Sequence, residues 1–229
     1  MKIIGLIGGM SWESTLTYYE LFNTAAKEKL GGLHSAKVLL YSVDFYEIEA
    51  CMSAGDWEGA ARILIDAAQR LEKAGADFVM IGTNTLHKVA PAVEQEIGVD
   101  LLHIADAVAD ALLAKGITKA ALLGTRYTME QDFYTARLNR RGITVVVPEE
   151  AEREWLNSTI FNELCLGVVT DDAKRHIKAL CEQLAAEGAG GIILGCTELG
   201  MLIGQKDTSA PLFDSVIIHA KAAVQRALA

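Results

Sequence analysis

The chain has 229 residues, 51% of them hydrophobic, and carries a formal net charge of −9. This length accommodates one large domain or two domains of about 100 residues each. The negative charge argues against nucleic acid or an anionic membrane surface as the partner, because phosphate groups would be repelled. No apolar run approaches the ~18 residues of a membrane span. The four scattered cysteines include no C-x-x-C pair, so we expect no disulfide, no zinc site and a cytoplasmic location.

Apolar runs that read as strands alternate with segments of helical spacing along the whole chain. The predicted strands are 2–9, 36–45, 77–83, 100–105, 119–125, 143–148 and 190–196. The predicted helices are 15–31, 57–76, 86–98 (interrupted or started near Pro91), 106–116, 129–142, segments within 150–187, and 216–229. Most strands are continuously apolar, which is typical of parallel sheets covered by helices on both faces. The sequence therefore predicts the α/β class.

An internal repeat divides the chain into two similar halves. The stretch LEKAGADFVMIGTNT (71–85) aligns with LAAEGAGGIILGCTE (184–198), and LIGG (6–9) aligns with LLGT (122–125) at nearly the same spacing. General likeness among α/β strands is the alternative, but the agreement of the two spacings favours duplication. We therefore predict two parallel-sheet lobes related by pseudo-two-fold symmetry.

The repeat also predicts where a ligand binds. Ligands of open α/β sheets lie outside the carboxyl ends of the strands. With a pseudo-two-fold axis, Thr83 and Cys196 follow equivalent strands and face each other across a cleft between the lobes. Segments 8–11 and 125–128 are expected beside them. The cleft is therefore the predicted active site.

Cys196 is the cysteine whose setting is suited to chemistry. It follows a strand and a glycine and is expected to open a helix, where backbone N–H groups and the helix dipole lower the pKa of a thiol. The alternative is a buried, inert cysteine, which is common for this residue type. Cys51, Cys165 and Cys181 lie in helix-like segments, where we expect inert thiols.

The polar stretch GTNT (82–85) offers two hydroxyls, an amide and backbone donors at a helix start. Such groups suit a carboxylate or phosphate, and Thr or Asn also serves as a helix N-cap. His87 is expected to be a first-turn helix residue rather than a catalytic base.

Three further patterns are less informative. GLIGGMSW lacks the dinucleotide pattern G-x-G-x-x-G, and its glycines are expected to let the backbone approach a small ligand. Arg126 ends a strand and is either a carboxylate partner or a solvated surface residue. The remaining histidines show no metal-ligand spacing, and Asp171-Asp172 reads as a helix start.

Together these motifs resemble the aspartate/glutamate racemase family. The resemblance rests on MKIIGLIGGMSWEST, LGGLHSAKVLLYSVDF, TNTLHK, LLHIADA, LLGTRYTMEQDFY and GCTELG, in order along the chain. It implies a PLP-independent, metal-free amino-acid racemase with lobes 1–100 and 101–212, helix 213–229 packed back on the first lobe, and a homodimer. In this family, one cysteine from each lobe flanks the Cα of the substrate. The residues that the resemblance assigns to substrate binding are Met10, Ser11, Asn84, Thr85, Arg126, Thr197 and Glu198.

The chain departs from the family at the first cysteine. The family motif C-N-T is replaced here by Thr83-Asn84-Thr85, whereas Cys196 matches the second cysteine. A threonine hydroxyl is a much weaker acid than a thiol, and acid–base catalysis works best when the pKa lies near the working pH. We therefore predict that Cys196 removes the α-proton of the L enantiomer, and that Thr83 or a water protonates the opposite face.

Two other functions compete with this prediction. Arylmalonate decarboxylases resemble this fold and use a single cysteine of the second lobe as a protonating acid. Loss of one cysteine would also suit a non-catalytic dicarboxylate binder. The sequence does not decide between aspartate and glutamate, since one methylene is worth only about 1–3 kcal/mol of discrimination.

Overall fold

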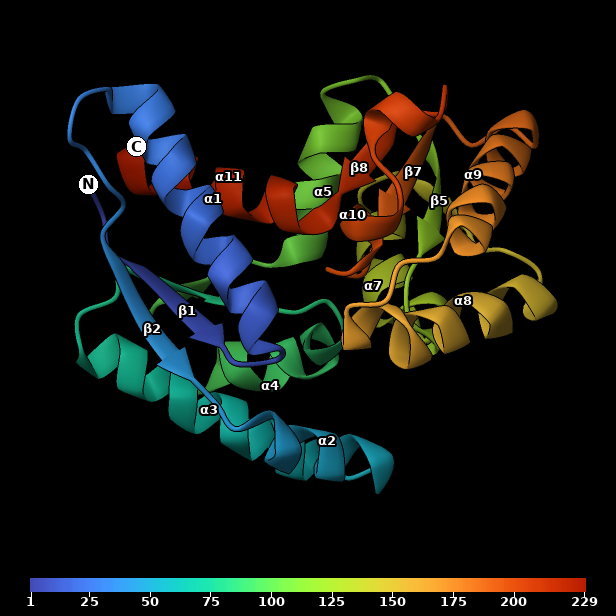
Figure 1. Ribbon diagram of the computed structural model, residues 1–229. Helices are drawn as coiled ribbons and strands as arrows, with labels where there is room; N and C mark the ends of the chain where they lie inside the picture. The colour runs from blue at the N-terminus through green and yellow to red at the C-terminus, as the bar shows by residue number, and fades with distance from the viewer. The chain divides into compact units, whose positions relative to one another are not determined.

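The computed structural model describes residues 1–229 as two compact units (Figure 1). Unit 1 comprises Met1–Ile104 and Val216–Ala229, and unit 2 comprises Ala105–Ser215. Each unit contains one four-stranded parallel sheet, in the order β2-β1-β3-β4 in unit 1 and β6-β5-β7-β8 in unit 2. The predicted α/β class is therefore confirmed, and the repeated strand order matches the repeat in the sequence.

The elements of unit 1 follow the predicted alternation. They are β1 (Ile4–Gly8), α1 (Trp12–Leu30), β2 (Val38–Ser42), α2 (Phe45–Ser53), α3 (Trp57–Lys73), β3 (Phe78–Ile81), the 3₁₀ helix η1 (Thr85–Val89), α4 (Ala90–Gln95), β4 (Asp100–Leu101) and α11 (Ser215–Leu228). Helices α1 and α11 cover one face of the sheet, and α3 and α4 cover the other (Figure 1). Every residue of β1 and β3 is buried, which explains their continuous apolar composition.

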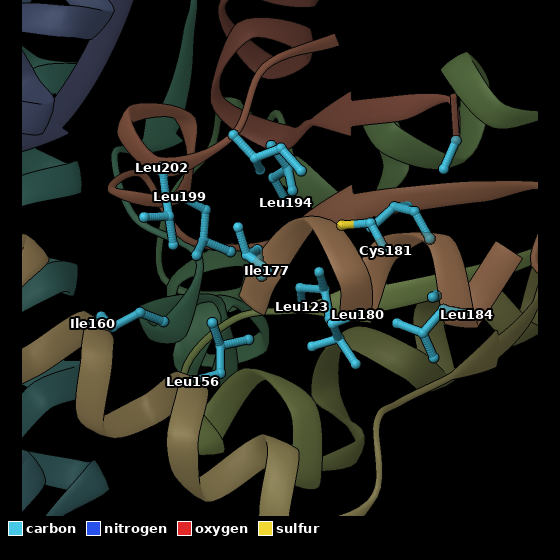
Figure 2. Close-up of a cluster of buried hydrophobic side chains, with 14 of the residues drawn as sticks. Leu123, Leu156, Ile160, Ile177, Leu180, Cys181, Leu184, Leu194, Leu199 and Leu202 are labelled. Carbon is cyan, nitrogen blue, oxygen red and sulfur yellow. The ribbon is translucent and has the colours of Figure 1, made fainter. Parts of the chain in front are cut away.

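The elements of unit 2 repeat this arrangement. They are α5 (Ile104–Leu113), β5 (Lys119–Leu123), α6 (Arg126–Glu130), α7 (Asp132–Arg140), β6 (Thr144–Val146), α8 (Glu150–Asn162), η2 (Leu164–Leu166), α9 (Asp171–Ala186), β7 (Gly191–Leu194), α10 (Leu199–Leu202), η3 (Gln205–Asp207) and β8 (Leu212–Asp214). Side chains of α8, α9 and α10 pack with those of β5 and β7 into one aliphatic cluster (Figure 2). On α5, Asp106 accepts hydrogen bonds of 3.0 and 2.8 Å from Arg137 of α7, which joins these two helices.

Two equivalent glycines explain why the repeat is visible in the sequence. The amide of Gly82 donates to the carbonyl of Ile7 at 2.8 Å, and the amide of Gly195 donates to the carbonyl of Leu123 at 2.6 Å. A Cβ atom would lie 3.0 Å from the Ile7 oxygen at Gly82, and 2.9 Å from the Leu123 oxygen at Gly195. Both positions therefore exclude a side chain because the chain passes directly against the central strand of its sheet.

The main difference from the predicted elements is helix α2, which the sequence pattern did not reveal. Asp44 caps it by accepting a 3.0 Å hydrogen bond from the amide of Tyr46, but Ile48 is its one buried residue. A helix that buries so little has no apolar periodicity to detect. None of the helices combines the length and the apolar composition that a membrane-spanning helix needs.

Candidate active site

The carboxyl end of β7 carries a compact hydrogen-bonded group of three predicted site residues. Cys196 and Thr197 lie in the bend between β7 and α10, and both are half-buried. The Cys196 thiol donates to Oε2 of Glu198 at 2.9 Å. The hydroxyl of Thr197 donates to the same carboxylate oxygen. Glu198 therefore folds back on the two residues before it and holds the thiol in one direction.

The setting of Cys196 raises the pKa of its thiol well above the usual range. Burial is the largest cause, and the negative charge of Glu198 and its hydrogen bond to the sulfur add to it. The expected lowering of this pKa by a helix start is therefore wrong. Helix α10 begins only at Leu199 and has four residues, whereas a carboxylate contacts the sulfur directly. In the resting protein Cys196 is a thiol.

The carboxyl end of β3 carries the second polar group, Thr83-Asn84-Thr85. Thr83 and Thr85 are half-buried, and Asn84 is only 3% exposed. Asn84 is the N-cap residue of η1, but its side chain makes no capping hydrogen bond. The N-cap role that the sequence suggested for Asn84 is therefore not observed. The buried ring of His87 donates to the carbonyl oxygen of Thr83 at 2.7 Å. The sequence did not identify His87 as a site residue. Its position four residues after Thr83, about one helical turn, is the signal that could have indicated this contact.

The loop after β1 holds Met10 and Ser11. Met10 is 5% exposed, and the hydroxyl of Ser11 caps α1 by accepting from the amide of Ser14 at 3.3 Å. Gly9 has a φ of +92°, and a Cβ there would lie 2.3 Å from the carbonyl oxygen of Val43. The sequence predicted that the glycines of this loop let the backbone approach a small ligand. At Gly9 the approaching group is instead the backbone of the chain itself, after β2.

The segment after β5 places Arg126 on the surface. Its side chain is 55% exposed, and its Nε lies 3.4 Å from Oε2 of Glu130, one helical turn away. The other oxygen of Glu130 accepts from Arg153 at 3.1 Å. Arg126 therefore already has a carboxylate partner within unit 2, and its assignment to a substrate carboxylate stays a prediction.

The other cysteines have different surroundings. Cys181 lies among aliphatic side chains of α9 and its neighbours (Figure 2), and burial raises the pKa of its thiol to about 12. Such a thiol is unreactive at neutral pH, as predicted. Cys51 is half-buried in α2, and Cys165 is exposed in η2. No group of three or more His, Cys, Asp or Glu side chains is arranged to hold a metal ion.

Comparison with known proteins gives a consistent result. The family model described as Asp/Glu/hydantoin racemase matches residues 7–223. A crystal structure of a candidate Asp/Glu racemase from Yersinia pestis is 51% identical, with complete coverage of both chains and a TM-score of 0.96. An aspartate racemase homologue from Pyrococcus horikoshii is 41% identical over both full chains, with a TM-score of 0.89. The broad specificity amino-acid racemase RacX of Bacillus subtilis is 26% identical over 99% of each chain. The protein belongs to the Asp/Glu/hydantoin racemase family.

Proposed function

We propose that the protein racemises an acidic amino acid, aspartate or glutamate, without a cofactor, and that it favours the L enantiomer. Family membership supports the reaction class. The observation that carries the proposal is the Cys196–Glu198 pair, in which a thiol donates to a carboxylate at 2.9 Å at the end of β7. A thiol that can pass its proton to an adjacent carboxylate is a usable base even when its own pKa is high.

The first half of the reaction starts at this pair. When substrate binds, the S–H bond of Cys196 breaks and its proton moves to the Glu198 carboxylate. The resulting thiolate takes the α-proton of the L enantiomer, and the electron pair of the C–H bond stays on the substrate as a carbanion. The α-ammonium group of the substrate offsets the negative charge that builds up near the sulfur. Glu198, which the resemblance assigned to substrate binding, thus acts as the proton acceptor for Cys196.

The second half of the reaction needs an acid on the opposite face of Cα. We assign it to the Thr83 hydroxyl or to a water held by it. Its O–H bond breaks and the proton goes to the carbanion. The oxygen then regains a proton from solvent, Glu198 releases to solvent the proton it took from Cys196, and the sulfur of Cys196 keeps the α-proton. In the reverse direction the group at Thr83 would have to remove a proton, for which a hydroxyl is a poor base at neutral pH. The enzyme should therefore process the L substrate faster than the D substrate. Hydroxyl and amide groups of Ser11, Asn84, Thr85 and Thr197, with Met10 beside them, are proposed to hold the substrate, and Arg126 is a further candidate.

The proposal is tested with each enantiomer of aspartate and glutamate in deuterated water. Mass spectrometry follows exchange of the α-proton, and chiral chromatography follows inversion. We expect rapid exchange and inversion of an L substrate, with slower exchange of the D form. Faster exchange of D than of L would contradict the assignment of Cys196 to the L-facing side. A complete lack of exchange with all four amino acids would refute the proposed reaction.

One observation favours a second candidate function. Because Cys196 is protonated at rest, it is equally suited to deliver a proton to a carbanion that another reaction generates. Loss of carbon dioxide from a substituted malonate is such a reaction. Release of carbon dioxide from phenylmalonate, abolished in Cys196→Ser, would identify the protein as a decarboxylase, whereas no release leaves racemisation as the function.

We also propose that the protein forms a homodimer through α1. Trp12, Leu16 and Tyr19 follow one another at helical spacing and are 62%, 58% and 56% exposed. Contiguous exposed apolar residues on one helix face mark interaction surfaces. Light scattering should show a dimer for the wild type and a monomer for Leu16→Glu. The matched control is Thr17→Glu, at an exposed position on another face of α1, which should remain dimeric. A Leu16→Glu protein that stays dimeric would exclude this face.

A further inference from the structure

His87 is a buried, polar residue that the proposed reaction does not use directly. It lies in η1 with no exposed surface. Its Nδ1 is 2.7 Å from the carbonyl oxygen of Thr83, and its Nε2 is 3.2 Å from the amide nitrogen of Ile104. The Ile104 amide can only donate, so Nε2 must accept. The proton therefore sits on Nδ1, which donates to Thr83.

These two hydrogen bonds tie together the ends of two neighbouring strands of unit 1. Thr83 follows β3, and Ile104 follows β4 as the first residue of α5. The backbone amide of His87 also donates to the carbonyl of Asn84 at 3.1 Å. His87 thus holds two successive carbonyl groups, one through its ring and one through its backbone. A change of side chain leaves the backbone bond to Asn84 in place and affects only the ring's bonds to Thr83 and Ile104.

The backbone before Thr83 is already fixed, which makes the His87 contact decisive for Thr83. The amide of Gly82 is bonded to the Ile7 carbonyl of β1, and Gly82 has no room for a side chain there. Thr83 is the first residue beyond this anchor. The Cβ of Thr83 is placed by the backbone on both sides of it, and the ring of His87 bonds to the carbonyl on the side away from the anchor.

The surroundings of His87 keep its ring in place. The ring of His103 lies 4.4 Å away between centroids, and that of His219 lies 5.8 Å away. His219 accepts from the hydroxyl of Tyr18 at 2.9 Å and donates to the carbonyl of Leu102 at 2.8 Å. These contacts pack the imidazoles between α1, α11 and the end of β4. The ring of His87 is therefore packed against two other buried imidazoles.

We infer that His87 is a positioning residue that aims the Thr83 hydroxyl, and so controls proton delivery on the face of the substrate that Thr83 serves. This inference rests on the proposed racemase function. A positioning error of about 1 Å can cost on the order of 100-fold in rate. Loss of the His87 bond should therefore reduce inversion while sparing proton exchange at Cys196, which lies in the other unit.

Two substitutions separate the two hydrogen bonds of the ring. In His87→Gln, the side-chain oxygen can replace Nε2 and accept from Ile104, but the bond to Thr83 is lost. In His87→Asn, the shorter amide can replace Nδ1 and donate to Thr83, but the bond to Ile104 is lost. With the L substrate in deuterated water, we expect His87→Gln to invert 10- to 100-fold more slowly, with α-exchange within about twofold of wild type. His87→Asn should keep both rates within about threefold.

Thr83→Ala supplies the check that the effect passes through Thr83. Residues that act through one another are non-additive, so His87→Gln should cost nothing further in the Thr83→Ala background. Parallel loss of exchange and inversion in His87→Gln, or equal ratios of the two rates in all variants, would show that His87 only supports the fold. If His87→Gln fails to fold, His87→Asn decides, because it keeps the bond to Thr83 and loses the bond to Ile104. A wild-type ratio of inversion to α-exchange in this variant supports the inference, and an altered ratio contradicts it. A wild-type protein that exchanges no substrate refutes the proposed function instead.

Discussion

Replacing Glu198 by glutamine separates two effects of this residue on Cys196. A thiolate and a carboxylate 2.9 Å apart repel each other by about 6 kcal/mol at an effective dielectric constant of about 20, and by about 1.4 kcal/mol in bulk water. The site is half-buried, so the repulsion lies between these limits. Glutamine removes it and lowers the pKa of the thiol relative to wild type. Glutamine cannot, however, accept the thiol proton, so the base for the reaction is lost.

The two effects have opposite signs in two assays. A change of 1.4 kcal/mol raises the thiolate fraction tenfold, and the lower intrinsic nucleophilicity of a more acidic thiol reduces the gain to about threefold. Alkylation of Cys196 by iodoacetamide at pH 7 should therefore be at least about threefold faster in Glu198→Gln. Racemisation of the L substrate should be about 10²- to 10⁴-fold slower, which is the usual contribution of acid–base catalysis.

The controls are chosen within unit 2. Glu198→Asp keeps a carboxylate and should retain part of the activity, and Glu182→Gln, on the exposed face of α9, should change neither assay. Peptide mapping identifies alkylation at Cys196 against the background of exposed Cys165. The reasoning is refuted by a Glu198→Gln protein that racemises at the wild-type rate, or whose Cys196 is alkylated more slowly than in wild type.

Three further predictions concern other parts of the chain. Thr83→Cys should bring the rates from the L and D enantiomers closer together, because in the proposed mechanism each face of Cα would then be served by a thiol; an unchanged ratio of the two rates in the chirality assay would contradict the proposed role of Thr83. Gly195→Ala should destabilise the protein to urea by about 1–3 kcal/mol, because its Cβ would lie 2.9 Å from the Leu123 carbonyl, whereas Gly204→Ala, whose Cβ would lie 3.5 Å from Asp207, should have little effect. Burial lowers the pKa of His219 to about 4 from an ordinary 6.5, so the unfolded chain binds more protons between these values. Stability should be fully present above about pH 6.5 and fall by up to about 3 kcal/mol towards pH 4, and His219→Gln should show a smaller loss in urea titrations at the two pH values.

Much of the fold was predictable because its signals are local. Parallel strands buried on both faces are continuously apolar, and β1 and β3 show this in the sequence itself. The glycines that touch a neighbouring strand, Gly82 and Gly195, recur at equivalent places because both sheets have the same strand order. Helix α2 escaped prediction because it buries only one residue and so carries no periodic pattern.

The sequence by itself determined the α/β class, the repeat and the polar residues at the strand ends. Only the tertiary structure decided the state of the chemical groups. The Cys196 thiol is more basic rather than more acidic because the Glu198 carboxylate folds back onto it and burial removes water. His87 reaches both Thr83 and Ile104 because two strand ends lie side by side. Apolar periodicity is a property of neighbours along the chain, whereas a proton's affinity depends on charges, water and hydrogen bonds within a few ångströms in space.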